Sequence, residues 1–151
     1  MTVLPHDPYI QEVAHALANI GLDVADTWTC DADTRGLHCI LNASLELTPE
    51  ESGIDPDLWP AGLLLLWEWH PGREEGEADR GPVWLWAKKY RDGGNTEPAA
   101  LPVEGYANPT QVAATAGELA ATGEAVKTRP GQWRGTPALD AAITVWEAND
   151  G

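Results

Sequence analysis

The amino-acid sequence predicts an α+β domain with an N-terminal helix, a four-stranded antiparallel sheet of two hairpins, and two C-terminal helices packed on one face of that sheet. Apolar residues recur at helical spacing near both ends of the chain, and they alternate at strand spacing in the middle. Pro and Gly mark the boundaries of most of these segments. A chain of 151 residues is the usual size of one domain, so we expect residues 1–151 to form a single unit.

The first helix is expected to begin at Asp7-Pro8, because Asp is a common N-cap and Pro suits the first helical position. The residues after it have one apolar stripe, formed by Ile10, Val13, Ala14, Leu17 and Ile20. Gly21 then predicts the end of the helix, in the position just after its C-cap.

The first hairpin is predicted from two alternating segments around the turn Asp33-Thr34-Arg35-Gly36. A symmetric turn sets Leu22 opposite Leu47, Val24 opposite Leu45, Trp28 opposite Leu41 and Cys30 opposite Cys39. All these apolar side chains then share one face. The facing cysteines would be close enough for a disulfide, but buried thiols are ordinary in such a setting, so both states stay open.

The second hairpin is expected from strands near residues 61–70 and 82–91, which carry two Trp-x-Trp pairs around a charged loop. Its register is open. In an odd register, with Trp67 near Trp84 or Trp86, all four indoles line one face. In an even register each face receives one Trp pair. Both faces are apolar in either case, so each must be covered or must present a contact patch.

Three interpretations of this hairpin are possible: the indoles form the core, a protein interface, or a platform that stacks a small ligand. Glu68 and His70 share one strand face, and Lys88 lies on the return strand. The candidate binding residues are therefore Trp67, Trp69, Trp84, Trp86, Glu68, His70 and Lys88.

The remaining segments are predicted from their boundary residues. Residues 48–60 are a Pro- and acid-rich excursion with a helical turn, and residues 91–107 are a loop with a short extended piece at 101–103. Asn108-Pro109 predicts the start of a helix that stops near Gly123. Thr136-Pro137 opens the last helix, with Leu139, Ala142, Ile143 and Trp146 as its apolar stripe.

The charge is strongly negative, at −15. Residues 1–60 hold eleven acidic residues and one basic residue, so they supply −10 of it. Such a field repels phosphate backbones and anionic lipid, and it steers basic partners. We therefore expect neither nucleic-acid nor membrane binding, and we assign the steering surface to Glu50, Glu51, Asp55 and Asp57. The N-terminus shows no apolar signal segment, which favours a cytoplasmic location.

No motif in the sequence identifies a reaction. A Walker loop, a dinucleotide fingerprint, a nucleophile elbow and a zinc-protease helix are all absent. His38 is adjacent to Cys39 and so projects to the other face of its strand, which disfavours a zinc site with the cysteines. We therefore expect no metal and no cofactor, and enzymatic activity is uncertain.

Three stretches give the chain a resemblance: LPHDPYIQEVAHAL at the start, GLLLLWEWH with GPVWLWA in the hairpin, and PVEGYANPTQV after it. In these the chain resembles small acidic uncharacterised proteins of actinomycetes, a likeness that implies no activity and no functional residue. In size, acidity and element order it also looks like acidic immunity proteins that neutralise basic toxins, and like small acidic dimeric secretion chaperones. These two likenesses are fold-level analogies.

The function predicted from the sequence is a non-enzymatic acidic module, immunity-, antitoxin- or chaperone-like, that engages a basic protein partner. The acidic N-terminal half would steer the partner, and the Trp hairpin would supply contact energy. A homodimer through the sheet face is also possible. The alternative is a small-molecule binder or enzyme that uses a Trp-lined pocket with His70 and Glu68.

Overall fold

The computed structural model describes residues 4–31, 41–72, 81–125 and 133–150 and has the predicted α+β class. Its elements are α1 (Asp7–Asn19), β1 (Asp26–Cys30), β2 (Leu41–Leu47), α2 (Pro49–Ser52), β3 (Leu63–His70), β4 (Gly81–Lys88), β5 (Ala99–Ala100), α3 (Pro109–Thr122) and α4 (Thr136–Asp150). The strands form one antiparallel sheet in the order β1-β2-β3-β4-β5. The sequence predicted four strands and an extended piece at 101–103, whereas the fifth strand lies just before that piece. Two residues are too few for an alternation pattern.

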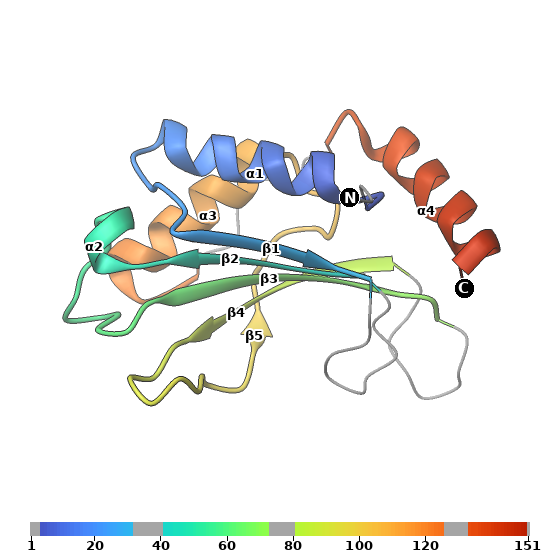
Figure 1. The fold of residues 1–151 in the computed structure, drawn as a ribbon. Coiled ribbons are helices and arrows are strands. Elements are labelled where there is room, and N and C mark those ends of the chain that lie inside the picture. The colour runs from blue at the N-terminus through green and yellow to red at the C-terminus, as the bar shows by residue number, and fades with distance from the viewer. Residues whose placement is uncertain (1–3, 32–40, 73–80, 126–132, 151) are drawn as a thin grey trace.

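The helices lie on one side of the sheet. Figure 1 shows α1 and α3 side by side over one face, and α4 beyond the N-terminal end of α1. The opposite face has no helix from the described residues over it. Leu139 and Ile143 of α4 are buried and belong to the same core cluster as the apolar residues of α1, α3 and the covered face. In the described part of the chain, no helix has the length and apolarity needed to cross a bilayer.

The ends of α3 and α2 follow from local capping. Asn108 caps α3, since its side-chain oxygen accepts a hydrogen bond from the Thr110 amide at 3.0 Å. Gly123 ends the helix with a φ of 79°, a left-handed conformation that favours glycine. Thr48 caps the short α2 in the same way, by accepting from the Glu51 amide. The prediction of α3 is confirmed at both ends.

The start of α1 differs by one residue from the prediction. His6 is the N-cap, and Asp7 lies within the first turn. The Asp7 carboxylate accepts hydrogen bonds from the Leu4 amide at 2.8 Å and from the Thr29 hydroxyl at 2.6 Å. Asp7 therefore ties the start of the helix to β1 instead of capping its own helix.

The register predicted for the first hairpin is wrong. Trp28 faces Ser44, and Cys30 faces Asn42, so neither faces Leu41 or Cys39 as expected. Thr27 and Thr29 take the helix-side positions of β1 instead, and the Thr29 hydroxyl reaches Asp7 there. Leu22 and Val24 pack against the core from the segment before β1, so Trp28 is not needed to fill it. The predicted turn at residues 33–36 and Cys39 lie outside the described residues.

The register divides the sheet into two faces. The core face, under α1 and α3, is formed by Leu41, Ala43, Leu45, Leu47, Leu63, Leu65, Trp67, Trp69, Trp84 and Trp86. The large apolar residues of the other face, which we call the open face, are Trp28, Leu64, Leu66, Val83 and Leu85. One row of the register, from Trp28 through Ser44, Leu66 and Leu85 to Ala100, crosses all five strands.

Candidate functional site

The second hairpin has the odd register. Trp67 pairs with Trp84, so all four indoles of the hairpin lie on the core face. Trp67 and Trp69 are fully buried and Trp84 is 2% exposed. The Trp67 indole N–H donates to the Gly105 carbonyl at 2.9 Å. The indole patch is therefore covered by the protein's own helices and by the segment before α3.

Tyr9 of α1 joins the indoles to that segment. Its hydroxyl donates to the Ala107 carbonyl at 2.6 Å and accepts from the Trp84 indole N–H at 3.2 Å. The centroid of its ring lies 4.9 Å from the ring centroid of Trp133. Burial raises the pKa of the Tyr9 hydroxyl, so the hydroxyl stays protonated and keeps donating. This network fixes the helix layer on the sheet.

Because three of the four indoles are buried, they cannot supply the binding energy for a partner, as the sequence had suggested. A partner cannot reach Trp67, Trp69 or Trp84 while α1 and α3 are in place. Trp86 differs, because it is half-buried and packs edge-on against Trp59, with ring centroids 5.9 Å apart. A cavity of about 390 Å³ lies beside these two rings, and Lys88 lines it.

Glu68 and His70 lie on the opposite side of the sheet from the indoles. The His70 Nε2 atom is 3.4 Å from a Glu68 carboxylate oxygen, and both side chains are buried. The sequence therefore placed these two residues on a shared strand face correctly. They cannot, however, line one pocket with Trp69 from the same side of the sheet, as the predicted Trp-lined pocket required.

The four residues predicted to steer a partner are all exposed. Glu50 and Glu51 lie in the first turn of α2, and Asp55 and Asp57 follow in the next segment. The Asp55 carboxylate accepts from the Asp57 amide at 2.8 Å, which shapes that segment. Their charges face solvent, where they contribute to the field that a partner meets.

His6 is a buried histidine for which the sequence indicated no partner. Its Nε2 atom lies 2.7 Å from the carbonyl oxygen of Asn42, so Nε2 carries the proton and donates it. The ring stacks on Trp67, with centroids 5.2 Å apart. Desolvation lowers the pKa of His6, although the hydrogen bond to Asn42 and the charge of Asp7 oppose that effect.

This setting predicts a loss of stability in weak acid. Below the ordinary pKa of 6.5, the unfolded chain takes up a proton that the folded His6 excludes. The free energy of unfolding is therefore expected to fall as the pH drops from 6.5 through the lowered pKa, with no contribution from His6 above 6.5. Urea unfolding at several pH values, for the wild type and for His6→Gln, measures this.

The comparison isolates His6 because glutamine keeps an N–H donor for Asn42 but does not titrate. We expect the difference in stability between wild type and His6→Gln to shrink or reverse in acid. His15→Gln, on an exposed position of α1, is the matched control and should keep the wild-type pH dependence. Equal pH dependence in wild type and His6→Gln would contradict the assignment.

The open face carries apolar surface that the sequence did not single out. Trp28 is 45% exposed and Val83 is 40% exposed. Leu66 and Leu85 lie in the same row of the register as Trp28, Leu64 neighbours Leu66 on β3, and all three leucines are half-buried. Next to this surface, the Lys89 ammonium and the Glu46 carboxylate form an ion pair at 2.6 Å. The alternation of Leu64 and Leu66 with the indoles along β3 indicated a second apolar face. The predicted register of the first hairpin placed Trp28 on the core face, so its exposure was missed.

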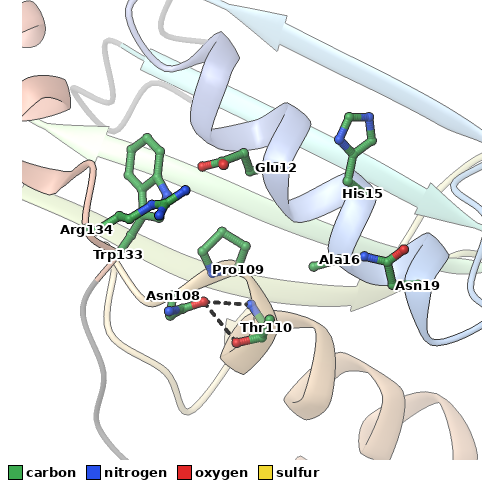
Figure 2. Close-up of a pocket in the computed structure, with 9 residues that line it drawn as sticks. All are labelled: Glu12, His15, Ala16, Asn19, Asn108, Pro109, Thr110, Trp133 and Arg134. Atoms are coloured by element: carbon green, nitrogen blue, oxygen red, sulfur yellow. Dashed lines mark hydrogen bonds between the residues drawn. The ribbon is translucent and has the colours of Figure 1, made fainter.

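A second hollow lies on the helix side, between α1, the start of α3 and the segment that holds Trp133 and Arg134. Its volume is about 430 Å³. Glu12 of α1 lines it, and Figure 2 shows the Glu12 carboxylate directed into the space towards Trp133 and Arg134. Sequence reasoning did not find this site, because its residues come from three distant segments.

Comparison with known proteins gives no assignment: no family model, no curated protein and no solved structure matches the chain. The resemblance to actinomycete proteins stays a prediction. The function is therefore argued from the surfaces and cavities of the molecule itself.

Proposed function

We propose that this protein is a non-enzymatic, cytoplasmic binding module that engages a basic protein partner through its open face. The observation that carries the proposal is the exposure of Trp28 and Val83, with half-buried leucines beside them, on a sheet face that no described helix covers. Large apolar patches on protein surfaces mark interaction sites, and the register sets Trp28, Leu66 and Leu85 in one row of the sheet with Val83 beside Leu85. Tryptophan is also the residue type most enriched among residues that dominate binding energy.

The charge of the chain supports a basic partner. The net charge is −15, and α2 with its following segment, which comes directly after β2, exposes four carboxylates. Such a field raises the association rate of a basic protein, while the apolar patch supplies the contact energy. The same field acts against a second copy of this chain, because two molecules of like charge repel each other as they approach.

The open face is tested with two substitutions on it and one matched control elsewhere. Trp28→Ala is expected to weaken partner binding by about 2 kcal/mol, roughly thirtyfold in Kd. Val83→Thr removes apolar contact on the same face, and Val145→Thr makes the same change on α4, where Val145 is 62% exposed. We expect Val83→Thr to reduce binding and Val145→Thr to leave it unchanged.

The measurement has two stages. Wild type and the three variants are used as baits in native cell extract at low and high salt, and proteins retained by wild type and Val145→Thr but lost by Trp28→Ala are identified. The Kd of each purified partner is then measured. The proposal requires a partner with a basic surface and binding that weakens as salt rises. A salt-insensitive homodimer, or a partner retained equally by every variant, would overturn it.

A further inference from the structure

The cavity in Figure 2 lies on the helix side of the sheet, away from the open face. Its volume of about 430 Å³ is near the lower end of small-molecule sites, which span roughly 300–1,000 Å³. Glu12, Trp133 and Arg134 line it, and so does Pro109 at the start of α3. The cavity thus brings together one negative group, one positive group and an apolar wall.

The Glu12 carboxylate has neither a hydrogen-bond donor for its buried oxygen nor a cation beside it among the described residues. One carboxylate oxygen of Glu12, Oε2, is buried and has no hydrogen-bond donor among the described residues. No described cation lies within ion-pair distance of Glu12, and this includes Arg134 across the cavity. A carboxylate that is partly withdrawn from water without a donor or a cation is costly, and a bound ammonium group would offset that cost.

The start of α3 does not supply an anion site. The Asn108 side-chain oxygen already accepts from the Thr110 amide and the Thr110 hydroxyl. The Asn108 carbonyl accepts from the amides of Gln111 and Val112. The amides that a bound anion would need are therefore occupied, which leaves the Arg134 guanidinium as the permanently charged cation that lines the cavity.

We propose that this cavity binds a free α-amino acid. The ammonium group of the ligand contacts the Glu12 carboxylate, its carboxylate contacts the Arg134 guanidinium, and its side chain lies against Trp133 and Pro109. A zwitterion fits because the two opposite charges line one space without pairing to each other. The indole wall favours an apolar or aromatic side chain. This site is independent of partner binding at the open face, so either proposal can fail alone.

The ligand class is tested on the unaltered protein by isothermal titration calorimetry with each of the twenty free amino acids. We expect saturable binding of at least one apolar or aromatic amino acid, with its N-acetyl and methyl-ester derivatives each binding about tenfold more weakly or worse. The proposal is overturned if no free amino acid binds at concentrations up to about 10 mM. It is equally overturned if both blocked derivatives bind as tightly as the free form.

Two variants then locate the site. In Glu12→Gln the free amino acid should bind at least about tenfold more weakly, and N-acetylation should carry no further penalty, because its charged partner is gone. In Arg134→Gln the free amino acid should also bind at least about tenfold more weakly, and methyl esterification of the ligand should carry no further penalty. Glu118→Gln and Arg91→Gln, both at exposed positions, are the matched controls and should bind like wild type. If N-acetylation weakens binding to the folded Glu12→Gln variant as much as it weakens binding to the wild type, the ligand's ammonium group does not contact Glu12 and the assignment is refuted.

Discussion

Replacing Trp67 by alanine is expected to lower the free energy of unfolding by about 3–5 kcal/mol, because a fully buried indole leaves a cavity that its neighbours only partly fill. The substitution also removes the ring on which His6 stacks and the N–H that Gly105 accepts. The Gly105 carbonyl loses its 2.9 Å donor and keeps only the Tyr9 hydroxyl at 3.5 Å, which adds to the cost. Urea unfolding followed by far-ultraviolet circular dichroism measures the change.

Trp28→Ala is the control for this prediction. The same side chain is removed, but Trp28 is 45% exposed on the open face, so we expect a loss within about 1 kcal/mol. The pair also separates two roles of tryptophan in this protein: Trp67 holds the helix layer on the sheet, and Trp28 is proposed to contact a partner. Equal destabilisation by the two substitutions would show that the two faces are not packed as differently as their burial indicates.

Helix ends were predictable from the sequence because capping is local. Asn108 and Gly123 bound α3 through contacts within a few residues, and Gly21, with a φ of 89°, follows the end of α1. The second hairpin was predicted to be apolar on both faces, and both faces are so. Its register stayed open, since either parity satisfies the alternation pattern equally.

The register of the first hairpin was not predictable in this way, because a contact distant in sequence decides it. The Thr29 hydroxyl reaches Asp7 of α1, and that contact takes the helix-side position that alternation had given to Trp28. His6 similarly finds its acceptor on Asn42, in another element. The candidate surfaces were missed for the same reason: Trp28 was assigned to the wrong face, and Glu12 and Arg134 line one cavity only in the folded chain.

Gly105→Ala is expected to destabilise the fold by about 3 kcal/mol, at the upper end of the usual cost of overpacking. A Cβ at this position would overlap the carbonyl oxygen of Pro82 and come within 2.5 Å of its carbonyl carbon. These are backbone atoms of β4, so they cannot move aside as the end of a side chain can. Any shift of the backbone at Gly105 would also disturb its carbonyl, which accepts from Trp67.

Gly117→Ala provides the opposite test within the same protein. Gly117 lies inside α3, where alanine is favoured over glycine by up to about 1 kcal/mol. Its added Cβ would meet the tip of the exposed Ile20 side chain, 3.1 Å away, which can rotate, and the Leu22 side chain at an ordinary contact distance of 4.0 Å. We therefore expect Gly117→Ala to leave stability unchanged or raise it, measured by the same urea unfolding. An equally small effect of Gly105→Ala would contradict the close packing of the segment before α3 against β4. The burial of Trp67 would then not depend on that packing.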